Sequence, residues 1–405
     1  MAAEKWLFPV LSAVFLSALL FLSALSGFFA STSSSAASAS SKPLIISPST
    51  TSSSLPSFAY YISGIRGDGP RILRLLLAVY HPRNRYLLHL APDASDGERR
   101  DLARAVRSRI PAARMFGNVD VLGKPDAATY MGSSVLASML HAAAVMLRLG
   151  GRWDWFITLS AADYPLVSQD DLFHAFSSAP REINFIDHTS DVGWKDYHRV
   201  QPIVVDPGIY LARRVQIFHA TERRPTPESF KFFTGSPWVI LSRPFVEFCI
   251  LGWDNLPRTL LLYFTNALIP EESYFHSVAC NSQGFQNTTV NSDLRYMVWD
   301  NPPGMEPHFL NVSDYDEMVQ SSAPFARQFH MDEPLLRKID GEILRRGYNH
   351  VAPGAWCTGG VRPWFDQCSK WGDPNTVKPG PRAEKLKELV MKLLEERDSQ
   401  SGWCK

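Results

Sequence analysis

Short apolar runs alternate with helical segments from Phe58 onward, and this alternation constrains the fold more than any other feature. The strand-like runs are 58–63, 86–90, 155–159 and 182–186. The segments with helical spacing between them are 71–80, 95–108 and 134–149. Units of this kind predict an α/β sandwich with a parallel sheet. Ligands of open α/β sheets bind beyond the carboxyl ends of the strands, so residues just after Ser63, Leu90 and Leu159 are candidates for a binding cleft.

An uncharged apolar stretch, 6–30, precedes this region and is long enough to span a bilayer as a helix. A cleaved signal peptide is the alternative, and we favour an uncleaved anchor. The following residues, 31–57, are mostly Ser, Ala and Thr, which is typical of a flexible stem. Residues 1–5 would be a cytosolic tail. We therefore expect a single-pass type II protein of the Golgi membrane with a lumenal catalytic domain.

Two sequons fit a lumenal domain, at Asn287 and Asn311. Lys plus Arg number 41 against 40 Asp plus Glu, so no whole-chain field exists for holding nucleic acid. We divide the rest of the chain into a catalytic domain, 58–345, and a C-terminal extension, 346–405. The extension is rich in Cys and Trp and contains an amphipathic helix at 385–396.

The five cysteines form no CxxC pair, so their spacing does not indicate a structural zinc site. Cys357 and Cys368 bracket a loop rich in Gly and Trp and are our first choice of disulfide partners. Cys249 with Cys280 is the second choice. One cysteine would then remain free.

The segment WDWFITLSAADYPL, 153–166, resembles the strand and loop of glycosyltransferase family 14. This family holds the core-2/I-branching N-acetylglucosaminyltransferases and the protein xylosyltransferases, and the closest resemblance is to plant β-glucuronosyltransferases that act on arabinogalactan. Further matching blocks span nearly everything after the stem, among them LLAVYHPRNRYLLHL (76–90), GWKDYHR (193–199), FTGSPWVILSR (233–243), PEESYFHSVACN (270–281) and SSAPFARQFHMDEPLLRKID (321–340).

The resemblance implies a GT-A fold, inversion at the anomeric carbon, a UDP-sugar donor and no divalent metal. For this chain it implies UDP-glucuronate as the donor and the β-galactan of a proteoglycan as the acceptor. GT-A enzymes that use a metal generally carry Asp-x-Asp after a strand. Here the loop offers Asp163 alone, and one carboxylate is a poor Mg²⁺ or Mn²⁺ site unless substrate phosphates complete it.

The resemblance also implies a catalytic base, because inverting transfer needs a carboxylate to take the acceptor hydroxyl proton. Register with the block Tyr274-Phe275-His276 places this base at Glu272 rather than Glu271. Without the family, two adjacent Glu at a helix start would be solvated partners of the helix dipole.

For the diphosphate, the resemblance points to Arg327 and to Gln328, which stands where the family usually has Lys. Gln328 carries no charge, so Arg327, helped by His330, would stabilise the leaving group. The expected contacts to uridine and ribose lie at the strand ends. They are Ser63, Gly64, Arg66 and Asp163, with Asp93 as a substitute for the Asp that Ala91 replaces.

On the sugar side, Trp238 and Trp194 are candidates for stacking on sugar rings. A glucuronate carboxylate needs cations, for which we nominate Lys195, His198 and Arg199. Tyr130 and Gly132 are expected to line the donor pocket. Three alternatives remain open: a xylosyl- or N-acetylglucosaminyltransferase of the same fold, a catalytically inactive glycan-binding homologue, and a glycoside hydrolase that pairs Asp163 with Glu272.

Overall fold

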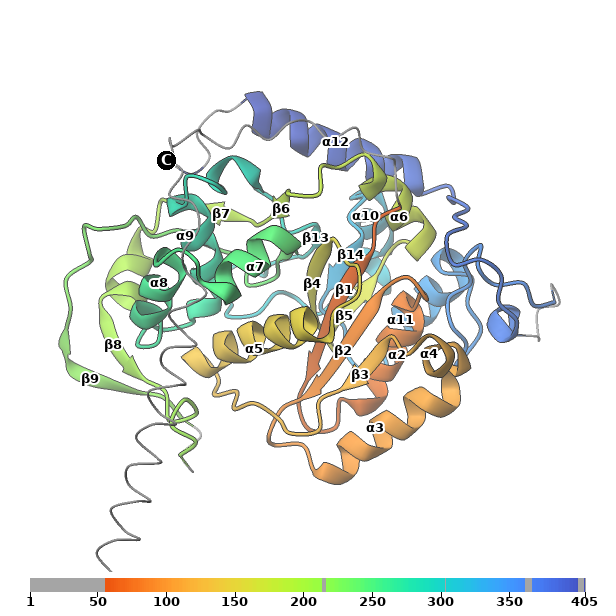
Figure 1. Cartoon of the computed structure of the whole chain (residues 1–405), viewed down its shortest axis with the longest axis horizontal. Helices are drawn as coiled ribbons and strands as arrows, with labels where there is room; N and C mark the ends of the chain where they lie inside the picture. The colour runs from red at the N-terminus through yellow and green to blue at the C-terminus, as the bar shows by residue number, and fades with distance from the viewer. Residues whose placement is uncertain (1–54, 213–215, 303, 361–365, 400–403, 405) are drawn as a thin grey trace, which may run out of the picture. The chain divides into compact units, whose positions relative to one another are not determined.

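The computed structural model describes residues 55–405 except 213–215, 303, 361–365, 400–403 and 405. The chain divides into two units, Met1–Ser52 and Ser53–Lys405, and the second holds the helices and strands shown in Figure 1. The predicted tail and anchor, and the stem up to residue 54, lie outside the described residues. Among the described residues, no helix combines the length and the apolarity that crossing a bilayer requires. The backbone amide of Ser57 donates to the Asp154 carboxylate (2.8 Å), so the folded unit begins before Phe58.

The central sheet has seven strands in the order β12-β6-β11-β4-β1-β2-β3. Their bounds are β1 (Phe58–Gly64), β2 (Arg85–Leu90), β3 (Val119–Val121), β4 (Trp155–Ser160), β6 (Asn184–Phe185), β11 (Ile240–Ser242) and β12 (Thr289–Val290). The pairs of β1 with β2 and β4 are parallel, as predicted. The prediction of a parallel sheet does not hold at β11, which runs antiparallel to β4 and β6. The chain enters β11 from β10 (Thr234–Gly235), which pairs with β7 (His188–Thr189) just after β6, so no crossover helix intervenes.

Helices cover both faces of the sheet (Figure 1). One face carries α2 (Gly69–Val79), α3 (Asp96–Arg109) and α4 (Pro111–Phe116), and the other carries α5 (Ser133–Leu149) and α7 (Arg243–Leu251). The side chains of β1 alternate between two apolar cores, with Phe58, Tyr60 and Ile62 in one and Ala59 and Tyr61 in the other. Because both faces are covered, the strand reads as an unbroken apolar run. The α/β prediction is confirmed.

The remaining elements surround this sandwich. They are β5 (Asp163–Pro165), α6 (Gln169–Ser177), η1 (Asp196–Val200), β8 (Pro202–Val205), β9 (Phe218–Arg223), α8 (Leu256–Phe264), η2 (Pro270–Glu272), α9 (Tyr274–Asn281), η3 (Gln286–Thr288), β13 (Arg295–Tyr296), η4 (Val312–Asp314), α10 (Tyr315–Gln320), β14 (Phe325–Arg327), α11 (Pro334–Lys338), η5 (Ile339–Ile343), η6 (Gln367–Ser369) and α12 (Ala383–Ser399). Helix α12 packs against α6 and buries Leu386, Val390 and Leu394, as its apolar stripe predicts. The extension is therefore part of the same compact unit as the sheet.

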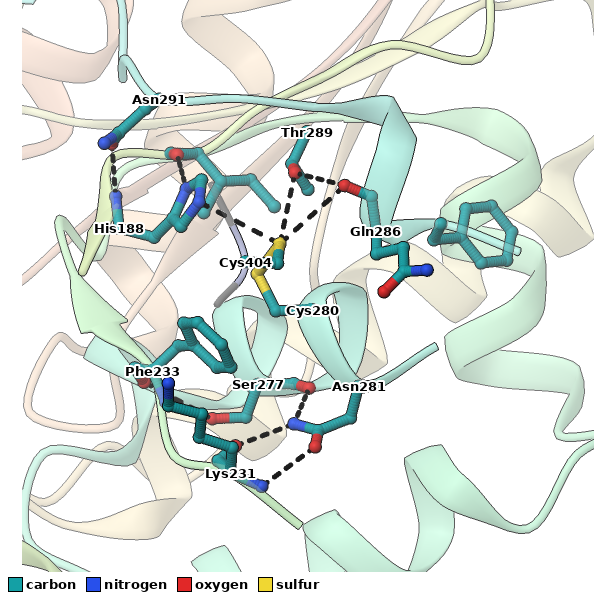
Figure 2. The surroundings of a disulfide bond; sticks show 12 residues. His188, Lys231, Phe233, Ser277, Cys280, Asn281, Gln286, Thr289, Asn291 and Cys404 are labelled. Carbon is teal, nitrogen blue, oxygen red and sulfur yellow. Dashed lines mark hydrogen bonds between the residues drawn. A yellow bond between two sulfur atoms is a disulfide. The ribbon is translucent and has the colours of Figure 1, made fainter. Parts of the chain in front are cut away.

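Two disulfides close loops in this unit. Cys357–Cys368 is the predicted first choice and is confirmed. The second choice is wrong, because Cys280 pairs with Cys404 and Cys249 is free. The sequence could not show that Cys404 lies beside Cys280 of α9 (Figure 2).

Candidate active site

The carboxyl ends of β1, β2 and β4 lie side by side. Ser63 is in register with His89 on one side and with Ser160 on the other. The loop after β4 folds back on itself, since the Ser160 amide donates to Asp163 Oδ2 (2.6 Å). The predicted nucleotide-binding positions after these strands therefore share one edge of the sheet, where open α/β sheets bind ligands.

Arg327 approaches this edge from β14, which pairs with β5 so that Arg327 faces Asp163. Its Nη1 donates to Ser160 Oγ (2.6 Å) and Asp163 Oδ1 (3.0 Å), and its Nη2 donates to Glu306 Oε2 (3.2 Å). Arg327 is 8% exposed, so its guanidinium binds oxyanions in a partly dehydrated setting. The side-chain amide of the neighbouring Gln328 is buried, and its Nε2 donates to the Pro307 carbonyl (2.7 Å).

Trp238 lies next to this arginine, with Arg327 Cζ 4.1 Å from its ring centre. A second guanidinium, that of Arg295, is 5.8 Å from the same ring. Arg295 is a residue that sequence reasoning missed. It is buried and donates to the Thr158 and Asp293 carbonyls, and burial lowers its pKa. The structure thus places Trp238 beside Arg327, the residue predicted to bind the diphosphate.

Glu272 is the last residue of η2, and Ser273 alone separates it from α9. Arg199 Nη1 donates to Glu272 Oε2, and Lys195 Nζ is 3.6 Å from the same oxygen. The Arg199 guanidinium is also 5.4 Å from the ring of Trp194, which is 64% exposed. The structure therefore brings together four residues that the sequence nominated separately: Trp194, Lys195, Arg199 and Glu272.

The segment 234–238 connects two groups of side chains. We call them the Glu272 cluster (Trp194, Lys195, Arg199 and Glu272) and the Arg327 cluster (Ser160, Asp163, Glu306 and Arg327). Thr234 Oγ1 is 3.4 Å from Lys195 Nζ, and the Ser236 carbonyl is 2.9 Å from His276 Nε2. Burial lowers the pKa of His276 to about 3, so the ring is neutral, and we assign its proton to Nε2, which donates to that carbonyl. At the other end of the segment, Trp238 contacts Arg327.

Helix α9, which follows Glu272, is anchored along its length (Figure 2). The Ser277 hydroxyl accepts from the Phe233 amide (3.1 Å), and Asn281 exchanges hydrogen bonds with the Lys231 backbone (2.9 and 2.7 Å). The disulfide of Cys280 with Cys404 adds a covalent tie. These contacts hold the element next to the predicted base.

Glu271 differs sharply from its neighbour. The residue is half-buried, but its Oε2 atom is out of contact with solvent and has no hydrogen-bond partner among the described residues. Burial is the main reason that the pKa of Glu271 is raised to about 8, and the nearby charge of Glu272 adds to the effect. Glu271 is therefore neutral at pH 7.

The backbone next to Glu271 is held in an unusual conformation. Ile269 (φ +49°) donates its amide to the carbonyl of Met131 (3.0 Å), which is itself left-handed (φ +62°). Such residues persist only where the surrounding structure fixes them. Met131 follows Tyr130, which is 65% exposed. This hydrogen bond joins the predicted donor-pocket loop to the loop of the predicted base.

Gly132 has a packing role. A Cβ there would lie 2.2 Å from Asp206 Oδ2, which accepts from the Ser134 amide at the start of α5 (2.7 Å). The predicted contacts after β1 and β2 meet one another, since the Arg66 amide donates to Asp93 Oδ2 (3.1 Å). Gly64 is packed too closely against Asp68 for a side chain.

The remaining nominated residues lie outside these clusters. His198 packs edge-on against Trp194 (5.8 Å), and His330 stacks on Phe309 (3.7 Å). Asn287 is exposed on η3, whereas the side chain of Asn311 caps η4.

The described residues bring one group of potential metal ligands within 4.8 Å of one another: His188, Cys280 and Cys404. Both sulfurs belong to the disulfide and are not thiolates, so this group does not fit a metal (Figure 2). After β4, Asp163 is engaged by the Ser160 amide and by Arg327. The charge partner at this loop is thus a guanidinium.

Comparison with known proteins identifies the family. Residues 58–319 match the family model of the Core-2/I-Branching enzyme. The chain is 50% identical over 362 residues to β-glucuronosyltransferase GlcAT14A of Arabidopsis thaliana, covering 89% of this chain and 81% of that protein. It is 47% identical to GlcAT14C of the same plant (88% and 87% covered), and 31% identical to xylosyltransferase 1 of Canis lupus familiaris (76% and 32% covered). The chain belongs to the Core-2/I-Branching enzyme family and is a glycosyltransferase.

Proposed function

We propose that this glycosyltransferase moves glucuronic acid from UDP-glucuronate onto β-galactan side chains of arabinogalactan proteins, with inversion and with Glu272 as the general base. The observation that carries the proposal is the placement of Arg199 and Lys195 at the Glu272 carboxylate. Two cations there can bind the carboxylate of a uronate donor, a group that neutral sugars lack. Two relatives of about 50% identity are named β-glucuronosyltransferases.

The chemistry is an in-line displacement. Glu272 takes the proton of the acceptor hydroxyl as that oxygen attacks the anomeric carbon, and the bond from this carbon to the diphosphate breaks. UDP leaves with the bonding electron pair, and Arg327 stabilises the charge that develops on it. Because attack and departure are on opposite faces of the sugar, the product has the inverted configuration.

The proposal includes independence from divalent metal, with Arg327 supplying the charge. Activity of the full chain should survive chelation with EDTA. Loss of activity that Mn²⁺ restores would contradict this part of the proposal. We also propose residence in the Golgi membrane as a type II protein, with the stretch 6–30 as the anchor. The two disulfides are consistent with a lumenal, oxidising location.

The decisive experiment offers the full chain a panel of UDP-sugars together with β-galactan oligosaccharides. We expect transfer from UDP-glucuronate, and we expect Glu272→Gln to keep UDP binding while losing at least about a thousandfold in kcat. Transfer by Glu272→Gln near the wild-type rate would show that the base is another residue. Preferential use of UDP-xylose or UDP-N-acetylglucosamine would favour the second candidate function, which the likeness to xylosyltransferase 1 supports.

A further inference from the structure

We propose that the base is switched on by the donor: the carboxylate of a uronate donor takes Arg199 and Lys195 away from Glu272 and thereby frees Glu272 to accept the proton. The inference rests on the proposed function and adds a reason why a neutral UDP-sugar is rejected. It concerns the described residues around η1 and η2.

In the structure one oxygen of the base, Glu272 Oε2, is occupied. Arg199 and Lys195 address the same atom, Glu272 Oε2, the first by donating a hydrogen bond and the second from 3.6 Å. An oxygen bound in this way is not free to accept from an acceptor hydroxyl, which must approach within hydrogen-bond distance for its proton to be taken. Proton transfer to Oε2 therefore requires the cations to change partner, whereas Oε1 carries neither contact.

The two cations have charge to spare for another carboxylate. Glu272 supplies one negative charge against two positive ones, and its neighbour Glu271 is neutral because burial raises the pKa of Glu271 to about 8. Other nearby acids are engaged elsewhere. Asp196 accepts from Thr226 and Gln201 (2.7 and 2.8 Å), and Asp206 accepts from the Ser134 and Gly208 amides (both 2.7 Å).

A uronate carboxylate has the same chemistry as the glutamate side chain that now holds the cations. The planar guanidinium of Arg199 can bind either carboxylate with two parallel hydrogen bonds, and Lys195 adds a point charge. The cluster is reachable, with side-chain exposures of 15% for Arg199, 27% for Lys195 and 20% for Glu272. The exposed ring of Trp194 beside Arg199 offers a face for the sugar.

Recognition of this carboxylate is separate from recognition of the diphosphate. Arg327 has its own acidic partners, Asp163 and Glu306, and shares no ion pair with the Glu272 cluster. A change at Arg199 or Glu272 should therefore alter the response to the sugar while leaving the affinity for UDP unchanged.

The first test is calorimetric binding to the full chain with Glu272→Gln. Removing the competing carboxylate should tighten UDP-glucuronate binding about fivefold, the upper value for a solvent-accessible ion pair, and leave UDP and UDP-glucose binding unchanged. Equal or weaker UDP-glucuronate binding in Glu272→Gln would overturn the inference. Wild-type protein that binds UDP but discriminates against UDP-glucuronate would instead refute the proposed function itself.

The second test compares kcat/KM for UDP-glucuronate and UDP-glucose in Arg199→Met. We expect the ratio of the two to fall at least about tenfold, with a rise in the UDP-glucose rate because the base is released without a uronate. The matched control is Arg223→Met, which removes another arginine that lies over an aromatic ring, 3.8 Å from that of Tyr197, without a partner in the Glu272 cluster. An unchanged ratio in Arg199→Met overturns the inference, and the binding test decides the matter if that variant does not fold.

Discussion

Replacement of Glu271 by Gln should raise the free energy of unfolding at alkaline pH and leave it nearly unchanged at acidic pH. The folded pKa of Glu271 is about 8, raised from 4.5 first by burial and then by the charge of Glu272. The folded state thus keeps a proton that the unfolded state releases. The stability that this proton represents is complete below pH 4.5 and is lost as the pH rises to about 8.

The size of the effect follows from linkage. Each pH unit between the two pKa values changes the free energy of unfolding by about 1.4 kcal/mol. Because the residue as a whole is only half-buried, we expect about 2–4 kcal/mol in total rather than the full product. Gln has the shape of the protonated acid and does not ionise. Glu271→Gln should therefore match the wild type near pH 5 and exceed it by about 2–4 kcal/mol at pH 9.

The assay is thermal and urea-induced unfolding of both proteins from pH 5 to pH 9. Glu388→Gln, which removes a carboxylate from the exposed face of α12, controls for the loss of one negative charge. The difference between Glu271→Gln and the wild type should widen steadily with pH. A difference that is the same at pH 5 and pH 9 would refute the assignment of a proton to Glu271. Transfer activity gives a second readout, since a new charge beside Glu272 should depress the wild-type rate above pH 8 and spare that of Glu271→Gln.

Three further comparisons test the site and its supports. Arg327→Met should weaken UDP binding at least about tenfold, because the diphosphate loses its cation. It should also destabilise the fold by about 3 kcal/mol, because Asp163 is left buried without its ion-pair partner. Isothermal titration measures the first effect and urea unfolding the second. Gly235→Ala, in the segment that joins the two clusters, would bring a Cβ to 1.8 Å from the Asp187 carbonyl oxygen. We expect about 3 kcal/mol of destabilisation and lost transfer. Gly284→Ala, whose Cβ would lie 3.9 Å from Ser282 Oγ in ordinary van der Waals contact, should leave both stability and transfer unchanged. Cys404→Ser opens a loop with a sequence separation of 124 and should lower the free energy of unfolding by about 4 kcal/mol. Cys368→Ser, with a separation of 11, should lower it by roughly 3 kcal/mol. Equal losses in the two variants would contradict the loop-entropy argument.

The sequence predicted the sandwich well because its signals are local. An apolar run between helical segments, such as 58–63, specifies a strand that is covered on both faces, and the structure has β1 there. The short strand β11 could not be predicted in direction. Its orientation depends on where β10 and β7 lie, and pairing between distant segments leaves no periodic signal in either of them.

The site was predictable as types of residue more than as contacts. Lys195 and Arg199 could be nominated as cations for a carboxylate, but nothing in their spacing indicated that Glu272 holds both in the structure. Arg295 was missed since a single arginine in the run Asp293–Val298 is unremarkable until it is seen buried beside Trp238. The contrast between Glu271 and Glu272 was also hidden, because adjacent residues differ in burial only through tertiary packing.

The hydrogen bond from Ile269 to Met131 joins the loop before α5 to the loop before η2, beside a second link from Ser133 Oγ to the Thr265 carbonyl (2.7 Å). Each of these residues has a backbone conformation that side chains rarely adopt and that persists only where the surrounding structure fixes it. A displacement of Tyr130 should therefore also shift the turn that carries Glu272, because this hydrogen bond connects the two loops. A substrate that orders the loop of Tyr130 should therefore also order the turn of Glu272. The position of the base would then depend on whether the loop of Tyr130 is in contact with substrate.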